Sequence, residues 1–202
     1  MYKYIDSWKN SSGAFEQQLA RNMEELNGQF PPHWMHFIDC LKSRPVTRVV
    51  DIGCGAGVYH HISTQMDTEY IGYDYSQHAV DLAIKTWNGN FICKDYQEIT
   101  PHDIEEGDLV IGNALCDVLP NGDECLRHLL QLESNNLLIQ RIKITQKPSF
   151  FTEYNAYGIM TYEFYHNFEQ LTQDIKDYGY IATYHKLYDD VLDLRITRHE
   201  TR

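Results

Sequence analysis

Three closely spaced glycines follow an apolar segment that contains a carboxylate. The segment is Val49–Ile52, with Asp51 near its end, and the glycines are Gly53, Gly55 and Gly57. Glycine reaches backbone angles that are closed to other residues, and without a Cβ atom it lets a ligand lie directly against the main chain. The pattern predicts a strand that runs into a loop built to hold a nucleoside cofactor.

A second apolar segment ends in a second acid. Tyr70–Tyr73 is followed by Asp74, which comes about 20 residues after Gly53, near the spacing at which a carboxylate meets the two ribose hydroxyls of a bound nucleoside. The two acids together indicate a cofactor site at the carboxyl ends of neighbouring strands.

The charges around the loop indicate which cofactor it binds. The glycines run Gly-x-Gly-x-Gly, and no Lys, Arg, Ser or Thr between Asp51 and Val58 is available to hold a pyrophosphate. Asp51, Asp74 and Asp95 are expected on one rim of the sheet, where they repel anions and suit a ligand with an ammonium, a sulfonium and a ribose. This ligand is S-adenosylmethionine.

The same residues resemble a known family. Asp51–Gly57 is similar to motif I of the class I S-adenosylmethionine-dependent methyltransferases, and the strand ends at Asp74, Asp95 and Asn113 resemble its later motifs. The resemblance implies that Asp51 lies near the cofactor's amino group, Asp74 on its ribose and Asp95 on its adenine. The full predicted cofactor set is Asp51, Gly53, Cys54, Gly55, Gly57, Asp74, Tyr75, Asp95, Tyr96, Asn113, Ala114 and Leu115.

The order of strand and helix signals predicts an α/β fold. We expect a doubly wound, mostly parallel sheet of seven strands with helices on both faces and an antiparallel hairpin at the C-terminus, formed by Ile181–Leu187 and Val191–Thr197. Helices are expected at Val58–Gln65, at Gln77–Trp87 and from Asn167 through Tyr178. The chain is expected to form a single domain, with an N-terminal helical lid (1–45), a cofactor-binding half (46–142) and a C-terminal part (143–202).

Two segments are expected to cover the site. Residues 1–45 are predicted to be helical with a break at Pro31-Pro32, and residues 143–166 are predicted to be an irregular, aromatic-rich lid. We expect Tyr154 and His166, in or at the edge of the second segment, to face the transferred methyl group, with His166 as a candidate general base. His60 and His61 are further candidates for the base, whereas the sequence favours a solvated loop acid at Asp117.

Composition limits the partners and the compartment. The formal charge of −12 argues against nucleic acid as a partner. Five cysteines without a Cys-x-x-Cys pair indicate reduced thiols and a cytoplasmic protein. No metal site is evident, no apolar stretch reaches the length of a membrane helix, and the chain is expected to be a monomer or a homodimer.

The predicted activity is the transfer of a methyl group to an oxygen or nitrogen of a small-molecule acceptor. The segment after the fourth predicted strand, Asn113–Cys116, lacks the Asn/Asp-Pro-Pro-aromatic run with which related enzymes hold a base or an amide. Two alternatives stay open, a non-catalytic protein that binds S-adenosylmethionine and a nicotinamide-dependent oxidoreductase.

Overall fold

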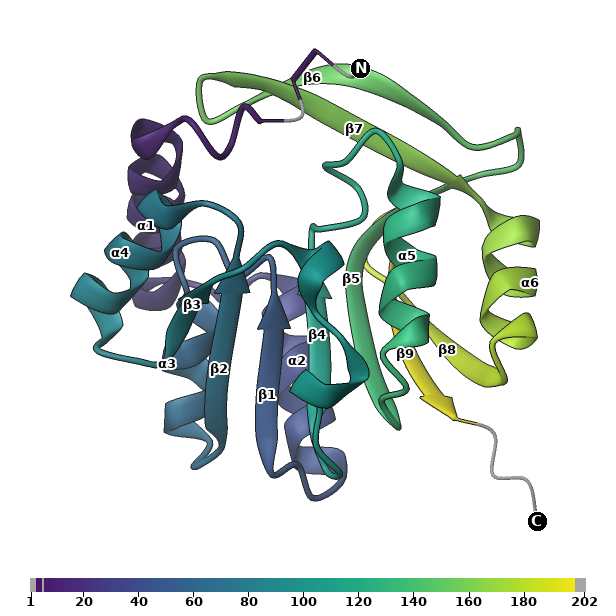
Figure 1. The fold of residues 1–202 in the computed structure, drawn as a ribbon, viewed down its shortest axis with the longest axis horizontal. Helices are drawn as coiled ribbons and strands as arrows, with labels where there is room; N and C mark the ends of the chain where they lie inside the picture. Colours follow the sequence, from purple (N-terminus) through teal and green to yellow (C-terminus); the bar gives the residue numbers. More distant parts are fainter. Residues whose placement is uncertain (1–2, 5, 199–202) are drawn as a thin grey trace.

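The computed structural model describes residues 3–4 and 6–198, which form one mixed sheet with helices packed against it (Figure 1). The strands of the described chain are β1 (Arg48–Ile52), β2 (Glu69–Asp74), β3 (Phe91–Cys93), β4 (Leu109–Asn113), β5 (Asn136–Thr145), β6 (Phe150–Ala156), β7 (Ile159–Asn167), β8 (Tyr180–Lys186) and β9 (Val191–Arg198). The α-helices are α1 (Ser12–Asn27), α2 (Pro32–Ser43), α3 (Val58–Gln65), α4 (Gln77–Trp87), α5 (Gly122–Gln131) and α6 (Phe168–Asp177). Two short 3-10 helices, η1 (Tyr96–Glu98) and η2 (Pro101–Asp103), follow β3.

The central strands are parallel and run in the order β3-β2-β1-β4-β5. Their side chains are apolar on both faces, as is typical of strands that are covered on both sides by helices. Side chains of α2, α3 and α4 pack on one face, and those of α5 and α6 pack on the other. This arrangement brings the carboxyl ends of β1, β2 and β4 to one edge of the sheet, where open α/β sheets bind their ligands.

Much of the predicted order is confirmed. The helices Val58–Gln65 and Gln77–Trp87 have the predicted bounds, and the Asn167 side chain caps α6 by accepting a hydrogen bond from the Gln170 amide at 2.8 Å. The N-terminal region forms two helices, with Pro32 in the first turn of the second. The C-terminal strands β8 and β9 form the predicted antiparallel hairpin.

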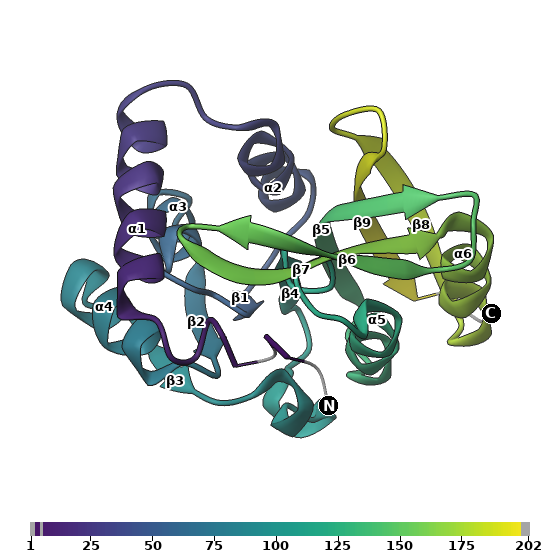
Figure 2. The same ribbon diagram turned by 90° about the horizontal axis from the view of Figure 1, so that it is seen from above.

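The prediction that residues 143–166 are irregular is wrong. Strand β5 continues to Thr145, and β6 and β7 form an antiparallel hairpin from Phe150 to Asn167. Its tip is a two-residue turn in which Tyr157 and Gly158 both have positive φ angles, of 51° and 79°. Two-residue turns with this backbone match the twist of the two strands that they connect. The sheet of the described residues therefore has nine strands where the sequence predicted seven. Figures 1 and 2 show that the added hairpin arches over the carboxyl ends of the central strands.

Strand β5 is bent between its two pairings. Its first part pairs with β9, its last residues pair with β7, and the β9 register shifts between Ile139 and Ile142. Inside this bulge Arg141 has a φ of 64°, a left-handed conformation that costs a residue with a Cβ about 1–2 kcal/mol. The Arg141 amide donates a hydrogen bond of 2.9 Å to Oδ1 of Asp193 on β9. The bulge is therefore held by a buried side chain of the neighbouring strand.

Among the described residues, we find no helix with the length and apolar character that crossing a lipid bilayer requires.

Candidate active site

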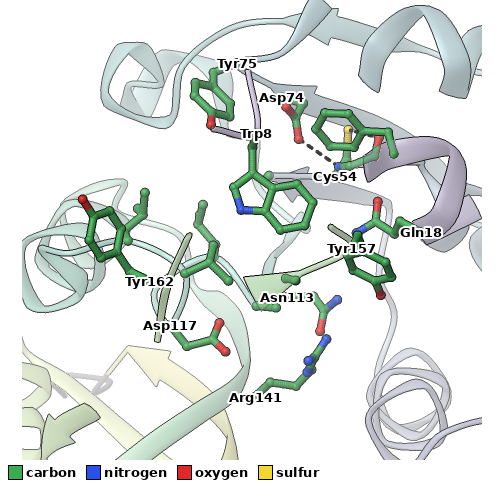
Figure 3. Close-up of a pocket in the computed structure, with 18 of the residues that line it drawn as sticks. Trp8, Gln18, Cys54, Asp74, Tyr75, Asn113, Asp117, Arg141, Tyr157 and Tyr162 are labelled. Atoms are coloured by element: carbon green, nitrogen blue, oxygen red, sulfur yellow. Dashed lines mark hydrogen bonds between the residues drawn. The ribbon is translucent and has the colours of Figure 1, made fainter. Parts of the chain in front are cut away.

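A cavity of about 850 Å³ lies at the carboxyl ends of the central strands. Its floor comes from β1, β2, β4 and β5, and its cover comes from α1, the segment before it and the β6–β7 hairpin (Figure 3). The cavity is large enough for a nucleoside cofactor together with a small second ligand.

The glycine loop turns tightly at the end of β1. The amides of Gly53 and Cys54 both donate to the Tyr73 carbonyl, at 2.8 and 3.0 Å. Gly53, Gly55 and Gly57 have φ angles of 77°, 52° and 78°, a region in which residues with a Cβ are strained. Because Gly53 and Gly55 line the cavity, the loop presents bare backbone to whatever binds there.

Asp51 is a buried carboxylate with an unpaired oxygen. Its Oδ2 accepts a hydrogen bond of 2.7 Å from the Tyr70 hydroxyl, whereas its buried Oδ1 has no hydrogen-bond partner among the described residues. Burial raises the pKa of Asp51 to about 7, against the opposing effect of the Tyr70 hydroxyl. An unpaired carboxylate oxygen in a cavity wall is suited to a cationic ligand group.

Asp74 organises the neighbouring strand end. Its Oδ2 accepts from the Gly55 amide and its Oδ1 accepts from the Ser76 amide, each at 2.9 Å. Burial raises the pKa of Asp74 to about 6, although these two backbone amides favour the ionised form. Asp74 thus joins the glycine loop to the start of α4 and faces the cavity with its remaining lone pairs.

Eleven of the twelve residues predicted to contact the cofactor line this one cavity, and they are Asp51, Gly53, Cys54, Gly55, Asp74, Tyr75, Asp95, Tyr96, Asn113, Ala114 and Leu115. Gly57 does not line it. A Cβ on Gly57 would lie 2.6 Å from Cε1 of Phe91 and 3.0 Å from Cβ of Ala83, so this glycine allows β3 and α4 to pack closely against the start of α3.

The cover of the cavity joins distant parts of the chain. The Trp8 indole donates a hydrogen bond of 3.1 Å to Oγ1 of Thr161 on β7, and its ring lies 6.0 Å from that of Tyr157 at the hairpin tip. On α1, Oε1 of Gln18 accepts a hydrogen bond of 2.8 Å from the Ala56 amide of the glycine loop. The N-terminal segment and the hairpin therefore form a continuous roof over the loop.

The far end of the cavity combines acidic, basic and aromatic side chains. Figure 3 shows Asp117 and Arg141 both directed into it from below, with Trp8 above. Burial raises the pKa of Asp117, although the positive charges of Arg141 and Lys143 favour its ionised form, and its Oδ1 has no hydrogen-bond partner among the described residues. Lys143 forms an ion pair with Glu163. This end can bind a polar ligand and exchange a proton with it.

Of the two predicted catalytic residues, the structure brings only Tyr154 to the cavity. His166 is fully buried, and its Nδ1 pairs with Oδ1 of Asp123 on α5 at 2.8 Å. Because β7 turns the His166 side chain toward α5, His166 does not lie among the lining residues and serves to pack the hairpin base. Of the alternative bases, neither His60 nor His61 lines the cavity.

Sequence reasoning missed two groups of this site. Asp117 was expected to be a solvated loop acid, but it is 5% exposed because the Phe164 amide of β7 donates to its carbonyl oxygen at 2.8 Å and fixes the loop under the hairpin. Arg141 was assigned no role, and its direction depends on the β5 bulge. Neither residue carries a local sequence signal, although an arginine and an acid after buried strands could have been marked as candidates.

Among the described residues, no three His, Cys, Asp or Glu side chains are grouped in a way that could hold a metal ion.

Comparison with known proteins supports the same reading. A family model described as a methyltransferase domain matches residues 43–186. None of the curated proteins matches the sequence. Among solved structures, an S-adenosylmethionine-dependent methyltransferase from Clostridium acetobutylicum is similar with a TM-score of 0.65 and 10% identity, over 91% of this chain and 98% of that one.

Two further structures have the same fold. A TehB-like methyltransferase from Corynebacterium glutamicum has a TM-score of 0.61 and 15% identity, with 93% of this chain and 98% of that chain covered. Magnesium protoporphyrin IX methyltransferase from Synechocystis, solved with bound S-adenosylmethionine, has a TM-score of 0.54 and 15% identity, with 98% and 86% covered.

The fold and the glycine loop define a methyltransferase of class I, which uses S-adenosylmethionine. The chain belongs to the methyltransferase domain family, as its sequence predicted.

Proposed function

We propose that this protein transfers the methyl group of S-adenosylmethionine to an oxygen or nitrogen of a small-molecule acceptor. The observation that carries the proposal is one cavity with two ends: the glycine loop and its acids form the first, and Asp117 and Tyr154 lie at the second. A cofactor at the first end and an acceptor at the second would meet inside a shared space.

The residues at the first end fit the cofactor. The unpaired Oδ1 of Asp51 suits the ammonium group, Asp74 suits the ribose hydroxyls, and Asp95 suits the adenine amine. The bare backbone at Gly53 and Gly55 leaves room for the methionine part. When bound, S-adenosylmethionine supplies an electrophilic methyl group on a sulfonium, and its remainder leaves as a neutral thioether.

The residues at the second end position the acceptor and take up its proton. Methyl transfer needs donor and acceptor atoms held in line, so much of the rate comes from positioning. Trp8 and Tyr154 supply aromatic walls against which an acceptor can pack. Burial raises the pKa of Asp117, which makes it a stronger base than an exposed aspartate. We assign Asp117 the role of general base that takes the proton of the acceptor hydroxyl or amine. Tyr154 orients the acceptor.

The overall charge of −12 favours a small molecule over nucleic acid, because phosphate backbones are repelled by an acidic protein.

Calorimetry and turnover test this proposal. S-adenosylhomocysteine should bind and NAD should not, and a panel of small hydroxyl- and amine-bearing metabolites should include a methyl acceptor. With that acceptor, Asp117→Asn should lower kcat by about 100-fold or more, the range of a general base, and leave the affinity for S-adenosylhomocysteine within about twofold. Absence of S-adenosylhomocysteine binding would refute the proposal as a whole. Full turnover of Asp117→Asn would remove Asp117 as the base, and binding without turnover on any acceptor would favour a non-catalytic binding protein.

A further inference from the structure

Arg141 is a cation that forms no ion pair with any described residue and lies at the second end of the cavity. Its side chain is exposed to the cavity that it lines, and its guanidinium makes no ion pair and no side-chain hydrogen bond with any residue that the structure describes. The chain has 29 acidic and only 17 basic side chains. An arginine that lines a cavity and forms no ion pair is available to bind an anionic ligand.

The other cations that line the cavity are paired, neutral or at its cofactor end. Arg21 pairs with Glu25 at 3.0 Å and Lys94 pairs with Asp103 at 2.7 Å. Lys143 pairs with Glu163. Lys9 lies at the cofactor end, where its backbone amide donates to the Tyr75 hydroxyl. His33 stays neutral because burial, and then the positive charge of Arg141, lower its pKa to about 3. Arg141 is therefore the cation that the second end offers to a ligand.

The fold fixes the position of Arg141. Its left-handed backbone is held by Oδ1 of Asp193, which is fully buried. The Oδ2 of Asp193 accepts hydrogen bonds from Gln140 at 2.8 Å and from His36 at 2.9 Å. A strained backbone that a buried aspartate holds in place is typical of positions that serve binding. The bulge therefore directs a guanidinium into the cavity from a rigid strand.

The surroundings of Arg141 select the kind of anion. Asp117 lies at the same end with an unpaired oxygen, and Lys143 is occupied by Glu163. Arg141 carries one positive charge and lies at the same end as the Asp117 carboxylate. It can compensate a ligand with one negative charge better than a ligand with two, which favours a carboxylate over a phosphate. The rings of Trp8 and Tyr154 line the same space and suit a planar ligand.

We propose that the acceptor is a planar aromatic molecule with a carboxylate group, and that Arg141 binds this carboxylate while the hydroxyl or amine to be methylated faces Asp117. The inference rests on the proposed function and names its substrate class. Arg141 acts as a recognition residue, and the carboxylate it binds is not the group that accepts the methyl.

The test measures by calorimetry how tightly hydroxybenzoates and aminobenzoates bind to the protein. Each carboxylate is compared with its own carboxamide, and each titration is done with and without saturating S-adenosylhomocysteine. At least one carboxylate should bind at least tenfold more tightly than its carboxamide, because only the carboxylate forms charge-assisted hydrogen bonds with the guanidinium. Arg141→Gln should reduce that carboxylate to the affinity of the carboxamide. Arg141→Lys should retain part of the preference, and Arg21→Gln, which alters a paired arginine of the same cavity, should retain all of it.

Three results overturn the inference: equal binding of carboxylate and carboxamide, a preference that survives Arg141→Gln, or failure of every carboxylate to bind a protein that binds S-adenosylhomocysteine. Tighter binding of phenyl phosphate than of all the carboxylates overturns the choice of anion. The proposed function has a separate readout, because it fails when S-adenosylhomocysteine does not bind, whatever the benzoates do.

Discussion

The buried carboxylate of Asp51 predicts how cofactor affinity depends on pH. Its pKa is raised to about 7 by burial, and the ammonium of the ligand is expected to bind only the ionised form. Raising the pH ionises Asp51 in the free protein, so affinity should rise with pH. From about pH 6 to about pH 8 the ionised fraction grows from about one tenth to about nine tenths, which corresponds to about a tenfold gain in affinity.

Asp74 adds a smaller effect with the same sign. Its pKa is raised to about 6, so about half of it is protonated at that pH and nearly none at about pH 8. If ribose binding needs the ionised form, the total gain in affinity over this range is about 20-fold. Asp51→Asn should keep only the part that belongs to Asp74, about twofold.

Calorimetry with S-adenosylhomocysteine at three pH values measures this dependence. Repeating the titration near pH 7 in buffers of different ionisation enthalpy also counts protons, and wild type should release about half a proton from Asp51 on binding. The Asp51→Asn variant should bind more weakly than wild type at each pH, and by the largest factor near pH 8, where wild-type Asp51 is almost fully ionised. A wild-type affinity that is flat between pH 6 and pH 8, or an unchanged slope in the variant, would refute the reasoning.

Three further outcomes are expected. Gly55→Val should lower S-adenosylhomocysteine affinity by tenfold or more in calorimetry, since valine is strained at a φ of 52° and its Cβ would lie 2.5 Å from Oε1 of Gln18, which binds the glycine loop; unchanged affinity would make the loop a plain turn. His166→Ala should lower the free energy of unfolding in urea by about 2–3 kcal/mol by removing the buried hydrogen bond to Asp123, with kcat within about twofold; a large loss of kcat in a stable variant would restore His166 as a catalytic residue. His36→Gln tests the Asp193 pair: burial lowers the pKa of His36, but the hydrogen bonds outweigh it and raise the pKa to about 9. Because the pKa of His36 is raised in the folded state, its stabilisation of the fold is complete below about pH 6.5 and is lost as pH rises through 9. The difference in unfolding free energy between wild type and variant should therefore shrink by about 2–3 kcal/mol from about pH 6 to about pH 10. A constant difference would contradict the pairing.

The cofactor end was predictable because its signals are local in sequence. A strand, a carboxylate and alternating glycines fall within Val49–Gly57, and the backbone angles that glycine permits are the ones the loop adopts. Gly57, the predicted residue outside the cavity lining, shows where such local signals are ambiguous. Its positive φ fits the loop pattern, and its lack of a Cβ makes room for the Phe91 ring. A glycine that is required for packing and one that is required for ligand contact look the same in a sequence.

The β6–β7 hairpin could not be found from alternating hydrophobicity. Every residue of β6 from Phe150 to Asn155 is exposed, so its aromatic side chains do not separate into a buried and a solvated face. The strand is formed by pairing with β7, which is half buried against α5. The Tyr157-Gly158 turn was the available signal, and aromatic density was a sign of strand propensity as well as of a lid.

The acceptor end depends on contacts between residues that are far apart in the sequence. Arg141 takes its conformation from Asp193, 52 positions later, and Asp193 is also bound by His36 of α2 and Gln140 of β5. Gln140 accepts a hydrogen bond of 2.6 Å from the Tyr59 hydroxyl on α3. The floor beneath the acceptor is thus a connected buried network, in which a change at one member alters the others.

The roof of the same cavity is held differently. Trp8 reaches β7 through one hydrogen bond of 3.1 Å, and the Tyr4 amide donates to the Tyr162 hydroxyl at 2.8 Å. Partly exposed bonds of this kind contribute about 0.5–1.5 kcal/mol each, and they open more readily than a buried network. Substitutions in the floor are therefore expected to change which acceptors bind, whereas substitutions in the roof are expected to change how fast acceptors bind and products leave. In a catalytic assay the first kind alters the ratio of kcat/KM between acceptors, and the second changes kcat/KM for all acceptors by a similar factor.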